Sequence, residues 1–125
     1  MIKGIGTDII EISRIKNVIE KRPEGFCDRF FTEEEKQYCQ LMKDPYPHYA
    51  VRFAAKEAVV KALGTGFRGM KFTDVEVTRD KAGKPSVQLH GKALEIARGK
   101  EIIKIELSLS HSKDSAVAFA IAIAE

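Results

Sequence analysis

Three charged side chains in this chain of 125 residues have the types and spacing that chemistry on a phosphate requires. Glu57 and Lys61 are four residues apart in a proline-free segment, and helical spacing would place both side chains on one face. Asp8 ends a predicted strand, directly after a run that contains two glycines. Magnesium is typically held by one or two carboxylates together with phosphate oxygens, and a nearby lysine neutralises charge on a leaving phosphate. The three residues therefore suggest a magnesium–phosphate site.

Each of these residues also fits an ordinary structural role. Glu57 and Lys61 match an exposed ion pair, which would stabilise a helix by only a few tenths of a kcal/mol. Asp8, taken alone, matches a turn aspartate that caps the following helix. The phosphate hypothesis requires two segments that are far apart in the chain to meet in the fold.

The segment 52–64, which carries Glu57 and Lys61, has the composition of a helix. It is rich in Ala, Leu, Lys and Glu, and Gly64 is a natural left-handed stop. Its small residues would allow another backbone to approach closely. Residues predicted to face a core recur at helical spacing: Val51, Ala55, Ala58, Val59 and Ala62. The glycine-rich, basic run 65–71 follows, and such a turn can approach a phosphate.

The first half of the chain predicts one strand and three helices. The strand covers 2–10, with Gly4 and Gly6 marking a bend or a close approach. A helix over 11–22 would bury three isoleucines and end at Pro23. Thr32 begins the next helix with a capping box, and that helix reaches about residue 42. After a break at 44–47, the central helix begins at about Tyr49.

The second half changes to a period of two residues after Gly69. We expect a strand around 72–77, a turn at 80–85, a return strand around 87–89, and a short helix over 92–99. Alternation at 103–109 predicts a strand with one buried face, and the apolar segment 116–124 predicts a central strand. The sequence therefore predicts a single α+β domain, residues 1–125, with a small, mainly antiparallel sheet packed on helices.

Composition narrows the function classes. The net charge of +3 is too small to indicate nucleic acid, but clustered charge would suit an acidic partner or a phosphorylated ligand. Cys27 and Cys39 lack metal-site spacing, which favours reduced thiols. Charges near the N-terminus exclude an apolar signal core, and no apolar run approaches the roughly 20 residues that a membrane helix needs. We expect a cytoplasmic protein that is not inserted in a membrane.

Four motifs together resemble the holo-acyl-carrier-protein synthases, the short class of 4′-phosphopantetheinyl transferases. The resemblance spans essentially the whole chain, with the motifs in order and at family-like spacing. They are Gly4-Ile5-Gly6-Thr7-Asp8, Arg52-Phe-Ala-Ala-Lys-Glu-Ala followed by Lys61, Gly83-Lys-Pro85, and Leu109-Ser-His-Ser112.

The resemblance implies transfer of phosphopantetheine from coenzyme A to a serine of apo acyl carrier protein, with release of adenosine 3′,5′-bisphosphate. Asp8 and Glu57 match the magnesium ligands of the family, and Lys61 matches the lysine that contacts the phosphates and protonates the leaving group. The serine would attack the β-phosphate in line. Glu57, directly or through a metal-bound water, is our first choice as general base, although this assignment stays open.

The resemblance also implies further contacts. Seven positions match family contacts to coenzyme A: Lys61, Gly64, Thr65, Gly66, Lys84, Pro85 and His111, with Ser112 beside the last. Each set also has a purely structural alternative. Gly64, Thr65 and Gly66 fit a helix cap and turn, Lys84 and Pro85 fit a tight β-turn, and His111 fits a structural histidine. Docking of the acidic carrier protein would use one face of the first helix, namely Arg14, Val18, Lys21 and Arg22, although such charges also fit a solvated face. The family is typically a homotrimer with active sites at subunit boundaries.

Two other function classes compete with this hypothesis. A noncatalytic module could hold coenzyme A or the carrier protein, but it would not need a pair of metal-binding carboxylates. A nucleic-acid-binding α+β domain would need a basic stripe interleaved with exposed aromatics, which the near-balanced charge does not favour.

Overall fold

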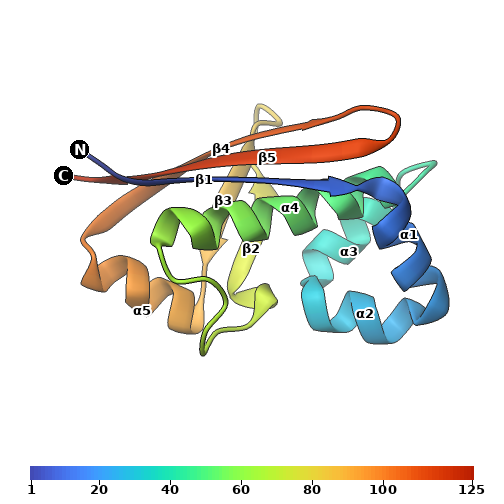
Figure 1. Ribbon diagram of the computed structural model, residues 1–125, viewed down its shortest axis with the longest axis horizontal. Helices are drawn as coiled ribbons and strands as arrows, with labels where there is room; N and C mark the ends of the chain where they lie inside the picture. The colour runs from blue at the N-terminus through green and yellow to red at the C-terminus, as the bar shows by residue number, and fades with distance from the viewer.

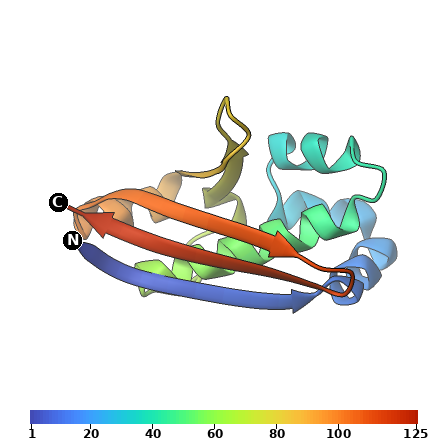
Figure 2. The same cartoon turned by 90° about the horizontal axis from the view of Figure 1, so that it is seen from above.

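A three-stranded antiparallel sheet lies across one long helix in the computed structural model, which describes residues 1–125. The strands are β1 (Ile2–Glu11), β4 (Ile102–His111) and β5 (Ser115–Ala124), in the order β1-β5-β4. The long helix α4 (Tyr46–Leu63) packs against one face of this sheet, mainly under β1 and β5 (Figures 1 and 2). The predicted α+β class, with the apolar strand β5 at the centre, is confirmed.

The remaining elements gather at the two ends of α4. Helices α1 (Ile12–Lys21), α2 (Pro23–Phe30) and α3 (Glu33–Gln40) cluster near its N-terminal half (Figure 1). The 3₁₀ turn η1 (Phe72–Asp74) leads into a separate two-stranded hairpin, β2 (Val75–Arg79) and β3 (Pro85–Leu89), and α5 (Gly91–Gly99) follows. None of the helices combines the length and the apolar character that crossing a membrane demands.

β1 and α4 touch backbone to backbone, as the glycines in β1 predicted. A Cβ atom on Gly4 would lie 2.0 Å from the carbonyl oxygen of Ala62, and one on Gly6 would lie 2.0 Å from that of Ala58. Only glycine on the strand, opposite alanine on the helix, leaves room for this contact. This pairing of small residues determines where β1 sits along α4.

α4 is buried on almost every side rather than along one stripe. Twelve of its 18 residues are buried, because the sheet covers one side while α1–α3 and β2 cover others. The predicted core residues of this helix are all buried. Gly64 ends the helix with φ of 80°, the left-handed cap that its position predicted.

Three local predictions were wrong. The first half contains four helices and not three: α1 ends before Pro23 as predicted, but Pro23 then begins α2, because proline at the first position of a helix loses no hydrogen bond. Pro47 likewise falls in the first turn of α4, so this helix begins at Tyr46 instead of Tyr49. Ile103 is 64% exposed, because a register shift in β4 between Ile102 and Lys104 gives the inward position to Ile102.

Candidate active site

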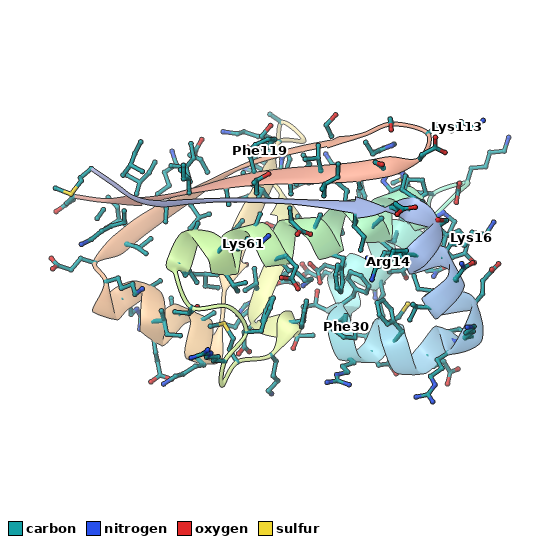
Figure 3. The ribbon with its side chains drawn as sticks, in the orientation of Figure 1. Arg14, Lys16, Phe30, Lys61, Lys113 and Phe119 are labelled. Atoms are coloured by element: carbon teal, nitrogen blue, oxygen red, sulfur yellow. The ribbon has the colours of Figure 1, made fainter.

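Asp8 and Lys61 meet because β1 packs directly on α4. Asp8 lies on the same strand face as Gly4 and Gly6, since alternate residues of a strand share a face. The Nζ atom of Lys61 lies 3.2 Å from Oδ1 of Asp8 and donates a hydrogen bond to the carbonyl oxygen of Thr7 at 3.0 Å. Lys61 rises from α4 toward β1 (Figure 3). Two segments separated by 53 residues therefore share one small site.

Glu57 is the third member of this site. It lies one helical turn before Lys61 and makes no ion pair with it, so the pair of helical neighbours proposed as an alternative does not form. Burial raises the pKa of Glu57, the negative charge of Asp8 raises it further, and Lys61 opposes this change. The two carboxylates therefore repel each other across the site.

The donor set suits a magnesium ion. Both donors are carboxylates, and their mutual repulsion is what a bound divalent cation would relieve. No three His, Cys, Asp or Glu side chains gather as a self-sufficient metal cluster in the chain. Magnesium usually binds through one or two carboxylates and completes its shell with water and phosphate oxygens.

The C-terminal end of α4 continues the site. Gly64 and Thr65 both donate backbone hydrogen bonds to Val60, and Thr65 Oγ1 donates to the carbonyl oxygen of Gly66. A cavity of about 430 Å³ opens here, and three lysines line it: Lys3, Lys61 and Lys100. This end of the helix therefore offers positive charge directly beside Lys61.

His111 and Ser112 lie at the far edge of the sheet. His111 ends β4, its ring centroid 5.8 Å from that of His48, and Ser112 closes the turn to β5 through hydrogen bonds with Ser115. Burial lowers the pKa of His48, and the charge of Arg52 lowers it further. His111 therefore lies beside a histidine whose neutral form is favoured.

Arg52 is a further candidate site residue, to which the sequence analysis assigned no role. It is 2% exposed, stacks on Tyr38 at 4.2 Å, donates to the carbonyl oxygen of His48, and leaves its Nε atom without a partner. Arg79 stacks on the same ring at 4.9 Å. Only its membership of the motif around Glu57 pointed to Arg52.

Lys84 and Pro85 lie on the β2–β3 hairpin. Asp80 closes the turn by accepting backbone hydrogen bonds, and Lys84 reaches Glu106 of β4 at 3.0 Å. Pro85 begins β3 beside a groove of about 500 Å³ between β3 and β4.

A single chain does not bring all predicted coenzyme A residues together. Asp8 lies on β1 and His111 on β4, which are opposite edges of the sheet with β5 between them. Neighbouring strands are about 4.8 Å apart, so these strands are separated by about 10 Å. Asp8, Glu57, Lys61 and Gly64–Gly66 therefore form one group. His111 and Ser112 lie at the end of β4, and Lys84 and Pro85 lie on the β2–β3 hairpin beside Glu106, so neither pair joins that group.

The predicted docking residues share an exposed surface. On α1, the three isoleucines Ile12, Ile15 and Ile19 are buried and face the protein core. The opposite surface of the helix and its C-cap carry four exposed residues: Arg14, Val18, Lys21 and Arg22. Arg14 is labelled at this end of the molecule in Figure 3. Val18 is an apolar residue surrounded by positive charges.

The outer face of the sheet is a large apolar surface that the sequence did not reveal. Ile5 is 70%, Ile9 69% and Phe119 54% exposed, and Phe119 projects from the face opposite α4 (Figure 3). Each of them alternates along its strand with less exposed residues, which belong to the face that packs on α4. Within one chain, nothing covers this face.

Comparison with known proteins identifies relatives of similar length. Residues 4–122 match the model of the 4′-phosphopantetheinyl transferase superfamily. Holo-acyl-carrier-protein synthase of Clostridium tetani is 55% identical over 97% of this chain and 95% of its own length. The same-named protein of Alkaliphilus metalliredigens is 57% identical over 98% and 99%.

Solved structures agree with these sequence matches. The crystal structure of holo-acyl-carrier-protein synthase from Neisseria meningitidis has a TM-score of 0.90 and 38% identity, covering 98% of this chain and 99% of that one. The synthase from Bacillus anthracis, crystallised in complex with CoA (3′,5′-ADP), has a TM-score of 0.82 and 39% identity, covering 100% and 99%.

Proposed function

The chain belongs to the 4′-phosphopantetheinyl transferase superfamily, and we propose that it transfers 4′-phosphopantetheine from coenzyme A to a serine of an apo acyl carrier protein. The other product is adenosine 3′,5′-bisphosphate. The observation that carries this proposal is the meeting of Asp8 on β1 with Lys61 and Glu57 on α4. Residues 1–125 would act as one domain.

The reaction breaks one bond and forms one bond at the β-phosphorus of coenzyme A. The serine oxygen attacks in line, and the bond to the oxygen of the departing bisphosphate breaks. Glu57 accepts the serine proton, and burial raises its pKa above that of an ordinary carboxylate. Lys61 neutralises the pyrophosphate and gives a proton to the leaving phosphate.

Asp8 and Glu57 would together hold Mg²⁺. When bound, the ion supplies positive charge that stabilises the pyrophosphate oxygens as the bond breaks. Lys61 already contacts Asp8 at 3.2 Å, so the ammonium group and the carboxylates are positioned to act on the same phosphates.

Coenzyme A would span two subunits. Gly64, Thr65 and Gly66 continue from Lys61, while His111 and Ser112 lie at the opposite edge of the sheet and Lys84 and Pro85 lie on the separate β2–β3 hairpin. A homotrimer whose subunits join through the apolar outer face of the sheet would complete each site with a neighbour. The exposed Ile5, Ile9 and Phe119 support this assembly, because such a patch usually marks an interface.

The acidic carrier protein would dock on α1. Arg14, Lys21 and Arg22 provide the steering charges, and Val18 provides an apolar contact at their centre. We place this activity in the cytoplasm. Cys27 and Cys39 are buried and free, which is consistent with a reducing compartment.

A mass-shift assay tests the proposal. Incubation with coenzyme A, Mg²⁺ and an apo carrier protein should add one phosphopantetheine to the carrier, and a chelator should abolish the shift until Mg²⁺ is restored. Binding of coenzyme A without any mass shift would support the noncatalytic module instead. Transfer that persists in the chelator would contradict the role of the two carboxylates.

A further inference from the structure

Lys56 and Glu35 form an ion pair that is completely removed from solvent. Nζ of Lys56 lies 2.8 Å from Oε1 of Glu35, and both side chains are 0% exposed. Lys56 directly precedes Glu57 in the sequence. The reaction steps proposed above use neither residue of the pair.

Every polar atom of the pair has a partner. Lys56 also donates to the carbonyl oxygens of Phe72 at 3.1 Å and Val75 at 2.5 Å, which uses all three of its ammonium hydrogens. Glu35 accepts hydrogen bonds from the backbone amides of Thr32 and Val77, each at 2.8 Å. The pair therefore connects α4 to α3, to η1 and to the start of β2.

The connection continues from the core to the surface. Thr32, which caps α3, donates its hydroxyl hydrogen to Glu76 at 2.6 Å, and Glu76 contacts His90 at 3.0 Å. Burial raises the pKa of Glu76, but hydrogen bonds from Thr32 and His90 outweigh it and lower the pKa overall. The network spans three elements around one side of α4.

Stability alone does not explain such a pair. Two charges lose their hydration on burial, and replacing a buried ion pair with apolar residues is often neutral or stabilising. Burial lowers the pKa of Lys56, and the charge of Glu35 opposes that change. A pair that is poor at stabilising a fold can still specify one packing geometry.

The geometry specified here is the rotation of α4 about its axis. Lys56 and Ala58 are two residues apart, or about 200° around a helix, so they lie on nearly opposite sides. Ala58 contacts Gly6 of β1, while Lys56 is bound to α3 and β2. Glu57 lies between these two attachments. At about 6 Å from the helix axis, a rotation of about 10° would move a side-chain atom by about 1 Å.

We propose that Lys56 and Glu35 are positioning residues that hold α4 at the rotation which directs Glu57 toward Asp8. This inference rests on the proposed function, because the pair can affect the reaction only if Glu57 takes part in it. A displacement of 1 Å at a reacting group can cost about a hundredfold in rate. The pair should therefore contribute to kcat and very little to the binding of either substrate.

The test replaces both charges at once, Lys56→Met with Glu35→Gln, so that no unpaired charge remains buried. The double variant should unfold cooperatively at a lower Tm, because the carbonyl oxygens of Phe72 and Val75 lose their donor, while kcat measured below that Tm falls about 10- to 100-fold. KM for coenzyme A and for the carrier protein should stay within about twofold of wild type. Glu35→Gln alone leaves the ammonium group of Lys56 buried without its counter-charge, so this variant should be less stable than the double variant, and its kcat should also fall when measured below its Tm.

Leu107→Ala is the matched control. Leu107 is a buried core residue on β4, so its truncation lowers stability by about 2–5 kcal/mol without touching the ion pair. This variant should keep kcat near wild type at temperatures where it is folded. A folded double variant with wild-type kcat would overturn the inference. Failure of both charge variants to fold would overturn it too, because the pair would then serve the fold rather than the rate.

The outcome is separable from that of the proposed function. If wild type itself transfers no phosphopantetheine, the proposed function fails. If wild type is active and the double variant is equally active, only the positioning role fails.

Discussion

At the scale of single residues, the site combines groups that destabilise one another. Glu57 is partly removed from water and lies within the electrostatic field of Asp8, while the only nearby compensation is one half-exposed lysine. A fold that evolved for stability alone would not keep two such carboxylates close together. The cost is typical of sites whose groups must act on a charged substrate.

Replacing Glu57 should separate activity from stability. Glu57→Gln should lower turnover by about 10²- to 10⁴-fold, the usual contribution of a general base. It should also raise Tm at pH 7–8 when measured in a chelator, because wild type carries a carboxylate whose charged form is disfavoured in the folded state.

The sign of this effect depends on pH. A raised folded-state pKa means that wild type loses stability as pH rises from the ordinary carboxyl range, near the reference value of 4.5, through the raised value. The advantage of Glu57→Gln should therefore vanish on acidification below that range. A variant that is less stable than wild type at pH 8 would contradict the explanation.

At the scale of elements, the contact between β1 and α4 assembles the site. Gly6 and Ala58 bring two backbones together, and the next residue on that face of β1 is Asp8. A larger side chain at Gly6 would force β1 and α4 apart. Under the proposed function, the glycines would therefore matter for catalysis although they offer no functional group.

Enlarging Gly6 should therefore impair the site from a distance. In Gly6→Ala the new Cβ would lie 2.0 Å from the carbonyl oxygen of Ala58, so β1 must shift away from α4. We expect a loss of about 1–3 kcal/mol in the free energy of unfolding, and at least a tenfold loss of kcat/KM as Asp8 moves from Lys61. Denaturant unfolding and the transfer assay measure the two effects.

Gly99→Ala serves as the control for that experiment. No atom lies within 4 Å of a Cβ at Gly99, and the residue ends helix α5. This change should leave activity intact and alter stability by no more than about 1 kcal/mol. Equal activity of Gly6→Ala and Gly99→Ala would contradict the role of the close contact.

At the scale of the whole molecule, one chain is an incomplete enzyme under the proposed function. The predicted coenzyme A residues are divided between the β1–α4 site, the opposite edge of the sheet and the β2–β3 hairpin, and the outer sheet face is apolar and uncovered. Association with further copies of the chain through that face would complete the site and would also cover the apolar surface.

Phe119→Glu tests this association. A charge at a position buried between subunits would lack a partner, so the variant should be monomeric by light scattering and should lose most of its transfer activity. Leu41→Glu is the control, since Leu41 is 83% exposed at the C-cap of α3, away from the sheet, and its replacement should change neither property. A trimeric and active Phe119→Glu would exclude the outer face as the interface.

Local sequence determined much of this protein. The capping box at Thr32, the stop at Gly64, the glycines of β1 and the apolar strand 116–124 each act through neighbouring residues or backbone sterics, and each was predictable. The α+β class and the candidate residues Asp8, Glu57 and Lys61 followed from such signals together with the family resemblance.

Only the tertiary structure decided how these parts combine. Pro23 and Pro47 look like helix breaks until their neighbours show that each lies in a first turn. Lys56 and Glu35 look like surface charges, because their burial depends on three elements that meet in space. Lys61 pairs with Asp8 instead of Glu57 for the same reason. Short-range patterns specify the backbone of each element, but the partner of a charged side chain depends on contacts between residues far apart in the chain.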